Sequence, residues 1–281
     1  MPENHFLQID QLSVHVQTCG AGQPAFLLLH GFAANLDSWE AVMGPLSRHG
    51  QVIAFDRPAF GQTERPLNWK GQNPYCFDAQ VELARQLLDA YNVPRAILMG
   101  HSAGGALALQ LALQYPERVQ ALVLVDAAIF SGGGPPGWAQ PLLGLPPIRW
   151  LGLRMIRQAG KRLPKLLELA WHDPQRLTPE IVSQYTRPLK LENWDRALWE
   201  FTRANQAPKL AGCLAQVRMP VLVVSGDDDR IVPPAESTRL AQELPDASRA
   251  IIPEAGHVPH EEQPEAFLQA VEAFLERLPV G

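Results

Sequence analysis

The stretch AILMGHSAGGALALQLALQY, residues 96–115, decides the fold class. Its start, Ala96–Met99, is a short and wholly apolar run, as expected of a strand buried on both faces. Residues 104–115 are typical of a helix, and the turn between them matches the pattern G-x-S-x-G. That pattern is weak by itself, but a serine between a buried strand and a helix is typical of a nucleophile.

Similar apolar runs recur on both sides of this stretch. Two short alternating strands, Phe6–Asp10 and Leu12–Gln17, predict a hairpin near the start. The other buried strands are expected at residues 25–29, 52–55, 121–125, 221–224 and 249–252, and amphipathic helices at residues 77–92 and 264–278. Strands that alternate with helices predict an α/β protein with a mostly parallel, doubly wound sheet of eight strands.

The alternation stops between about residue 129 and residue 217. We therefore expect a core in two parts, 1–128 and 218–281, and a helical lid inserted at 129–217. Five of the seven tryptophans lie in this insertion: Trp138, Trp150, Trp171, Trp194 and Trp199. They are expected either to line an apolar pocket or to form a small core of the lid itself.

Ser102 is the candidate nucleophile. Gly100 and Gly104 flank it, and side chains at those positions would clash in the strained turn that such a serine needs. The serine would lie at a helix N-terminus, where free backbone N–H groups favour developing negative charge. We expect an oxyanion hole formed by the backbone N–H groups of Ala103 and Phe32.

A serine hydroxyl needs a base to take its proton, and chain order places that base late, after the last strand. His257 fits this position. His260 is the nearby competitor, and His101, which directly precedes Ser102, is expected to point away from it.

The base needs an acid that fixes its tautomer and stabilises the imidazolium. Asp227, Asp228 and Asp229 follow the strand at 221–224, and Asp229 is the choice because it has cleared the strand end. The other two aspartates suit turn chemistry. Asp126, after the preceding strand, is the remaining alternative.

Taken together, these blocks resemble the α/β-hydrolase superfamily over nearly the whole chain except the lid. The matching segments are LLLHGF (27–32), DRPAFGQTERP (56–66), GHSAGG (100–105), YPERVQALVLVDAA (115–128), VLVVSGDDDRIVP (221–233) and GHVPHEEQPEAF (256–267). The resemblance implies Ser102 as nucleophile, Asp229 as acid, His257 as base and a helical cap after Asp126. One departure is Ala59, where relatives usually have glycine.

The nucleophile narrows the activities that the resemblance implies. Relatives similar to haloalkane dehalogenases and epoxide hydrolases use aspartate there, so a serine disfavours those reactions. A serine carboxylesterase acting on a small, largely apolar ester is expected. The alternatives are C–C bond hydrolysis of diketones, aminopeptidase action on N-terminal proline, cofactor-free perhydrolysis or haloperoxidase chemistry, and a non-catalytic binding role on the same fold.

Composition excludes several other classes. The formal net charge of -5 argues against a general nucleic-acid binder. Three cysteines, Cys19, Cys76 and Cys213, are too few and too scattered for a disulfide framework or a zinc knuckle. We find no export signal or integral membrane segment, and we expect a cytoplasmic protein without cofactor or metal. The oligomeric state is left open.

One further segment, residues 131–165, has six basic residues and no acidic one. Arg154, Arg157 and Lys161 share one helical face in this pattern. The segment is expected to be either a solvated face of the lid or a surface that attracts anionic lipids or acidic substrates.

Overall fold

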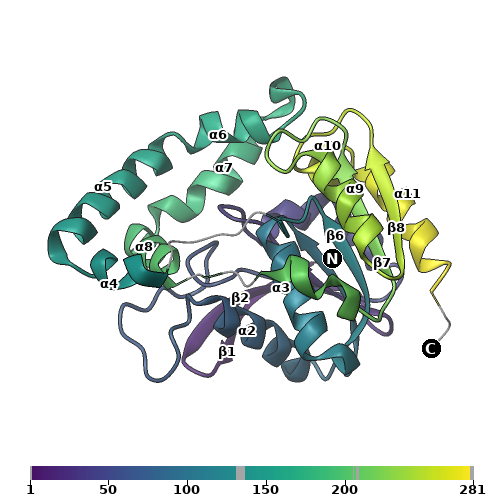
Figure 1. Ribbon diagram of the computed structural model, residues 1–281, viewed down its shortest axis with the longest axis horizontal. Coiled ribbons are helices and arrows are strands. Elements are labelled where there is room, and N and C mark those ends of the chain that lie inside the picture. The colour runs from purple at the N-terminus through teal and green to yellow at the C-terminus, as the bar shows by residue number, and fades with distance from the viewer. Residues whose placement is uncertain (1, 131–136, 205, 207–208, 279–281) are drawn as a thin grey trace.

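The computed structural model describes residues 2–130, 137–204, 206 and 209–278 (Figure 1). Within that part of the chain, eight strands form one sheet in the order β1-β2-β4-β3-β5-β6-β7-β8. Only the pairs β1–β2 and β2–β4 are antiparallel. The strands are β1 Glu3–Ile9, β2 Leu12–Cys19, β3 Ala25–Leu29, β4 Gln51–Phe55, β5 Ala96–His101, β6 Val119–Val125, β7 Val221–Gly226 and β8 Ala247–Ile252. The predicted α/β class and the mostly parallel sheet are confirmed.

Helices cover both faces of the sheet. The α-helices are α1 Glu40–Leu46, α2 Phe77–Ala90, α3 Ala103–Gln114, α4 Gln140–Leu143, α5 Pro146–Lys161, α6 Leu163–Ala170, α7 Pro179–Thr186, α8 Trp194–Ala204, α9 Pro234–Glu243, α10 Pro259–Glu262 and α11 Pro264–Leu275. Helices α2, α3 and α9 pack on one face, and α1 and α11 pack on the other. The sequence pattern did not indicate α1 or α9, which are short and contain or follow prolines.

The strands are apolar on both sides because both faces are covered. In β3, Leu27 and Leu29 point to the layer of α2 and α3, whereas Phe26 and Leu28 point to the layer of α1 and α11. Burial of each such side chain contributes about 1.5–3 kcal/mol to folding. A run without polar residues is therefore what this position in the sheet requires.

Helices α4 to α8 lie between β6 and β7 in the chain and form an arch to one side of the sheet (Figure 1). The glycine-rich start of the expected lid, residues 131–136, lies outside the described residues. The short 3₁₀ helix η6, Leu210–Gln216, packs into the same core layer as α3, so the last part of the expected 129–217 insertion contributes to the core. The domain limits at 128 and 217 stay a prediction.

The order of the strands sets where a site can form. The chain runs from β3 outward to β4 and then returns to β5 on the other side of β3. Ligands in such sheets bind outside the carboxyl ends of the strands at this reversal. In the described part of the chain, no helix has the length and apolar character needed to span a bilayer.

Candidate active site

Ser102 occupies a strained turn between β5 and α3. Its backbone has φ 51° and ψ −117°, a conformation that costs a non-glycine residue about 1–3 kcal/mol. Hydrogen bonds fix the turn on both sides. The Ser102 N–H donates to the carbonyl of Val125 at 2.9 Å, and the Ser102 carbonyl accepts from Gly105 N–H at 2.9 Å and Ala128 N–H at 3.2 Å. The surrounding structure thus holds the serine in a conformation that it would not adopt alone.

The flanking glycines are required by close backbone approach. A Cβ atom at Gly100 would lie 2.5 Å from the Gly104 carbonyl oxygen, and one at Gly104 would lie 2.1 Å from the Leu29 carbonyl oxygen. Real Cβ atoms do not approach a backbone oxygen so closely. The first turn of α3 can therefore pack against the end of β3 only with glycine at these positions.

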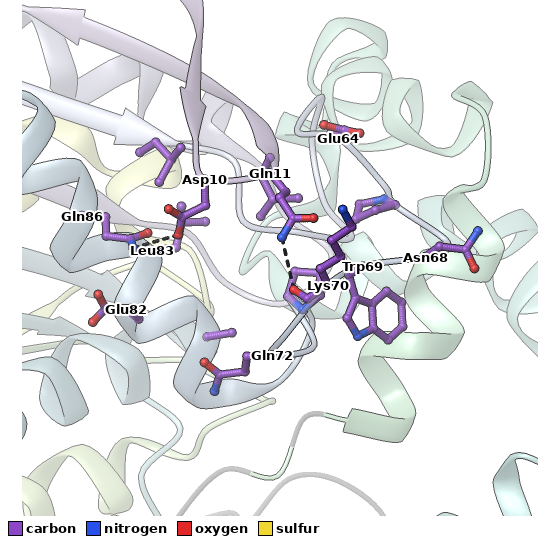
Figure 2. Close-up of a pocket in the computed structure, with 15 residues that line it drawn as sticks. Asp10, Gln11, Glu64, Asn68, Trp69, Lys70, Gln72, Glu82, Leu83 and Gln86 are labelled. Atoms are coloured by element: carbon purple, nitrogen blue, oxygen red, sulfur yellow. Dashed lines mark hydrogen bonds between the residues drawn. The ribbon is translucent and has the colours of Figure 1, made fainter.

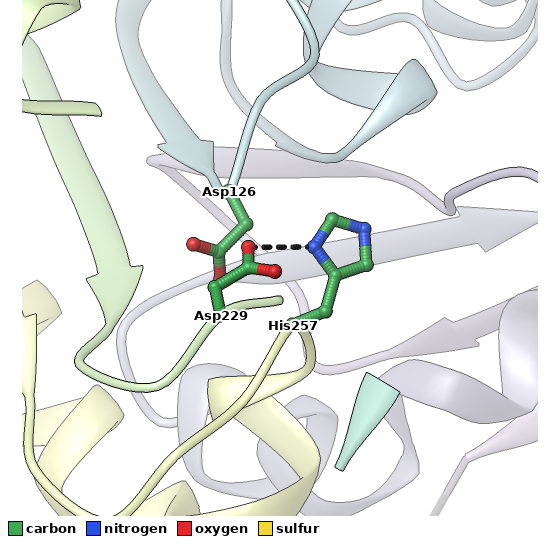
Figure 3. A group of neighbouring side chains, drawn as sticks. All are labelled: Asp126, Asp229 and His257. Carbon is green, nitrogen blue, oxygen red and sulfur yellow. Dashed lines mark hydrogen bonds and ion pairs between the residues drawn. The ribbon is translucent and has the colours of Figure 1, made fainter. Parts of the chain in front are cut away.

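His257 and Asp229 form a buried hydrogen-bonded pair (Figure 3). Nδ1 of His257 lies 2.7 Å from Oδ2 of Asp229. The other carboxylate oxygen accepts from the backbone N–H groups of Ile231 at 2.7 Å and Val232 at 3.0 Å. Because a carboxylate only accepts, Nδ1 carries the proton and Nε2 is left free to accept one.

Asp126 lies beside this pair but does not replace Asp229. Burial, together with the nearby charge of Asp229, raises the pKa of Asp126 well above its ordinary value, which favours the protonated form of this carboxyl group. Its Oδ2 is 3.4 Å from the backbone nitrogen of Gly226, and the hydrogen bond to His257 is made by Asp229.

These three side chains also offer one ligand atom each within 4.8 Å of one another. As a metal centre they fit poorly, because both oxygens of Asp229 already accept hydrogen bonds, one from His257 and the other from the N–H groups of Ile231 and Val232, and a cation would have to displace the His257 donor.

Asp227 and Asp228 take other roles. Asp227 accepts from the backbone N–H of Ala255 at 3.3 Å. Asp228 is partly exposed and pairs with His172 at 3.0 Å and with Arg230. Neither carboxylate contacts His257 within the described residues.

The other two candidate histidines are buried and neutral. His260 packs under the Trp39 ring with centroids 4.4 Å apart, and burial lowers its pKa to about 3. Burial likewise lowers the pKa of His101 far below its ordinary value. Nε2 of His101 lies 2.8 Å from the carbonyl oxygen of His257, to which it must donate. His101 therefore holds the backbone of the candidate base, a role that the sequence did not indicate.

The structure brings Ser102 and His257 to the same edge of the sheet, with the His101 ring against His257 at a centroid distance of 4.8 Å. Among the described residues no hydrogen bond joins the Ser102 hydroxyl to His257. Such contacts are often long in unliganded sites and shorten when substrate binds.

The two expected oxyanion donors lie at this same edge. Ala103 is the first residue of α3, so its N–H has no partner inside the helix. Phe32 follows β3 on a loop that Arg57 fixes: the guanidinium donates to the carbonyl of Gly31 at 3.0 Å, and the Arg57 backbone N–H donates to Nε2 of His30 at 3.0 Å. Burial lowers the pKa of His30 to about 3, so this acceptor stays unprotonated.

A junction with the cap holds the loop that carries His257. The His257 N–H donates to the Ala170 carbonyl of α6 at 2.6 Å. Beside it, the buried carboxylate of Glu262 accepts from Gly256 N–H at 2.6 Å and from His172 N–H at 2.8 Å. Glu262 has no local signal in the sequence beyond its place five residues after His257, and it is not among the predicted site residues.

Two of the cavities in the described part of the chain bear on this site, one because it lies near this edge and the other because it lies away from it. One of about 40 Å³ has mainly apolar walls and lies between the loop after Phe32 and the cap; Ala33, Phe60, Leu163, Trp194 and Leu198 help to line it. A second, of about 230 Å³, lies between the β1–β2 turn, the loop at 64–74 and α2 (Figure 2). None of the loops that carry Ser102, Asp229 or His257 lines the second cavity.

Comparison with known proteins agrees with this geometry. A family model described as the alpha/beta hydrolase fold matches residues 24–264. A 2-hydroxy-6-oxononadienedioate/2-hydroxy-6-oxononatrienedioate hydrolase of Burkholderia vietnamiensis is 29% identical over 281 aligned residues, with 95% of this chain and 92% of that protein covered.

Two solved structures are similar over 99% of this chain. A membrane phospholipase A, described as a bacterial virulence factor, has a TM-score of 0.77 at 28% identity, with 86% of its chain covered. A thermophilic esterase from Thermogutta terrifontis has a TM-score of 0.79 at 23% identity, with 100% of its chain covered.

Proposed function

The chain belongs to the α/β-hydrolase fold family, and from this premise we propose that it hydrolyses small, largely apolar carboxylic esters through an acyl-enzyme on Ser102. The observation that carries the proposal is the strained serine at the start of α3, on the sheet edge that also holds the His257–Asp229 pair. Strain at a polar residue that the surrounding hydrogen bonds maintain is typical of a functional position.

In the first step, the Ser102 hydroxyl attacks the ester carbonyl carbon while Nε2 of His257 takes its proton. Asp229 stabilises the imidazolium that forms and keeps Nδ1 protonated. The oxyanion accepts from the N–H groups of Phe32 and Ala103. His257 then gives its proton to the leaving alcohol, and the Ser102 acyl ester remains.

In the second step, His257 takes a proton from water, and the hydroxide attacks the acyl carbon. The carboxylic acid leaves as His257 returns the proton to Ser102. The groups that act in this scheme are two backbone amides, a hydroxyl, an imidazole and a carboxylate, and the scheme includes no cofactor or metal. The apolar lining near Phe32 supports an apolar acyl or alcohol group.

The proposal includes a cytoplasmic location, which the free cysteines Cys19, Cys76 and Cys213 support.

C–C bond hydrolysis is the second candidate, favoured by the similarity to the 2-hydroxy-6-oxononadienedioate hydrolase. The same serine, histidine and aspartate would serve, and the bond cleaved in the substrate would differ.

One panel separates these candidates. Hydrolysis of p-nitrophenyl esters with acyl chains of two to sixteen carbons is measured beside cleavage of a 2-hydroxy-6-oxo-dienoic acid, for wild type and Ser102→Ala. Ser183→Ala, an exposed serine of α7, is the control. Ser102-dependent ester turnover supports the proposal. Turnover of the 2-hydroxy-6-oxo-dienoic acid alone would favour C–C bond hydrolysis instead. Ester turnover that survives in Ser102→Ala would overturn the proposed role of Ser102.

A further inference from the structure

Exposed apolar side chains concentrate on one part of the cap. Of the thirteen large hydrophobic residues that are exposed in the described chain, eight lie between residues 138 and 169. On α5, Trp150 is 64% exposed, Leu151 51% and Met155 65%. Trp138 and Leu142, just before α5, are exposed as well. Single exposed hydrophobics are ordinary, but such a group marks an interaction surface.

The same segment is uniformly basic. No aspartate or glutamate occurs between Asp126 and Glu168, whereas six arginines and lysines do. Within the described residues, only Arg157 of these six forms an ion pair, with Asp195 at 2.6 Å. The Arg154 guanidinium lies over the Trp150 ring, 5.9 Å from its centroid. The basic groups are therefore available to an anionic partner.

Helix geometry places the apolar and basic residues on one outer face. Gly152 is buried against α8, where a Cβ atom would lie 2.0 Å from the Trp199 ring. Trp150 is about 200° away from Gly152 around the helix, and Arg154 and Lys161 lie within about 40° of Trp150. Leu151, Arg162 and Met155 lie about 100–140° from Trp150, so the six side chains span a broad sector of the helix that leaves out Gly152. We call these six residues the α5 face. At one margin of this sector, Trp150, Arg154 and Lys161 also line a hollow of about 600 Å³ between α5 and Trp194 of α8.

We propose that the α5 face docks on an anionic phospholipid bilayer. Its aromatic and aliphatic side chains fit the boundary between head groups and acyl chains, and its three basic groups fit lipid phosphates. Each basic group near an anionic membrane strengthens binding about fivefold. This proposal holds whether the reaction at Ser102 cleaves an ester bond or a C–C bond.

Charge complementarity favours this occupant over a second copy of the chain. A two-fold contact places each patch against its own copy, which would bring like charges together without an acidic residue on the face. A lipid surface offers the opposite charge and an apolar layer together.

The test is sedimentation of the full chain with vesicles of phosphatidylcholine and phosphatidylglycerol at 3:1, compared with phosphatidylcholine alone, in 0.05 and 0.5 M NaCl. We expect binding to the anionic vesicles at low salt and weaker binding at high salt. The charge variant Arg154→Gln/Lys161→Gln/Arg162→Gln should bind about 100-fold more weakly. The apolar variant Trp150→Ser/Leu151→Ser/Met155→Ser should bind at least about tenfold more weakly.

The matched control is Arg218→Gln/Ile251→Ser, which removes one exposed basic and one exposed apolar side chain from the surface of the protein outside the cap helices α4 to α8. It should bind as wild type does. All substituted positions are exposed, so circular dichroism and thermal melting should show intact folding in every variant. Absence of wild-type binding at low salt, or equal binding by all variants, would overturn the proposal. If the wild type forms dimers in the absence of lipid and only the apolar variant loses them, the α5 face would instead bind a second copy of the chain.

Discussion

Two regions of this molecule use polar side chains in opposite ways. At the edge formed by the carboxyl ends of the strands, Ser102, Asp229 and His257 are buried, and backbone groups hold each of them. For Ser102 and His257 these groups come from distant segments, and for Asp229 they come from the turn that follows it. On α5 of the cap, the side chains are exposed and few have partners. From this difference we expect the sheet edge to determine the reaction at Ser102 for every substrate. We expect the cap to determine which molecules or surfaces the protein meets.

The two regions meet at a junction built from both polar and apolar contacts. Glu262 and Glu261 of α10 bond to the cap through His172 and Tyr185, and Phe60 of the core packs on Phe201 of α8 with ring centroids 5.0 Å apart. Substitutions at the sheet edge, at this junction and in the loop that packs on the cap therefore test whether activity and stability depend on the two regions independently.

The largest effect is expected at the edge. Asp229→Asn should lower kcat/KM about 10⁴-fold for short and long esters alike, because the pair with His257 sets the tautomer of the base. Asp126→Asn should lower it less than about tenfold, because burial favours the protonated carboxyl group at Asp126, which asparagine resembles. Steady-state kinetics on two- and eight-carbon p-nitrophenyl esters measures both. Equal losses in the two variants would mean that the carboxylates share the role.

Glu262→Gln tests whether the junction only joins the core to the cap or also positions His257. The carboxylate serves backbone N–H groups of both the core and the cap, and loss of an acceptor leaves a buried donor unpaired. We expect the free energy of unfolding to fall by about 2–4 kcal/mol, since more than one such bond weakens. Because Gly256 precedes the base, kcat should fall about tenfold with KM nearly unchanged.

Glu265→Gln on the exposed side of α11 is the matched control for Glu262→Gln. Urea unfolding and ester kinetics well below the melting temperature separate the two effects. Lower stability with an unchanged kcat would make Glu262 a structural residue with no part in positioning His257.

Protonation of Glu261 gives a smaller, pH-dependent effect. Burial raises the pKa of its carboxyl to about 8 from an ordinary 4.5, and the Tyr185 hydroxyl of the cap donates to it. Between these values the folded state holds a proton that the unfolded state has released, so stability falls as pH rises. One group gives a slope of at most about 1.4 kcal/mol per pH unit.

His30 and His260 titrate in the opposite sense below about pH 6.5, because their pKa values are lowered in the folded state. Urea unfolding of wild type and Glu261→Gln is therefore compared from pH 6.5 to 8. The wild type should lose stability more steeply over this range. Parallel curves would show that Glu261 stays ionised in the folded protein.

The smallest effect is expected at Ala59, which has φ 77° in a loop that packs against the cap. Glycine relieves the left-handed strain but gains freedom in the unfolded chain. The two terms nearly offset, so Ala59→Gly should raise the free energy of unfolding by about 0.5 kcal/mol. A loss above about 1 kcal/mol in urea unfolding would show that the methyl contact with Ala197 and Phe201 outweighs the strain.

Much of the core could be predicted because its signals are local. The predicted strand at 25–29 matches β3 residue for residue, since only an apolar run can be buried on both faces. The serine turn was evident from a strand, a glycine-flanked serine and a helix in succession. The predicted helix at 77–92 ends two residues early, where Asn92 adopts φ 53°.

The junction could not be predicted, because its partners are far apart in the chain. Glu262 meets His172 across 90 positions, and His101 meets the His257 carbonyl across 156. A buried carboxylate or imidazole in the sequence does not show which backbone group it will meet. The choice between His257 and His260 rested on order alone, and the structure places only His257 against Asp229.

The central claim is that Ser102 is the nucleophile and that its environment makes it reactive. The most direct measurement is labelling with a fluorophosphonate, followed by intact mass and peptide mapping, on wild type, Ser102→Ala and Ser183→Ala. We predict one adduct per chain on Ser102 in wild type and in Ser183→Ala, and none in Ser102→Ala. Labelling that persists in Ser102→Ala, or a wild type that does not react, would contradict the claim.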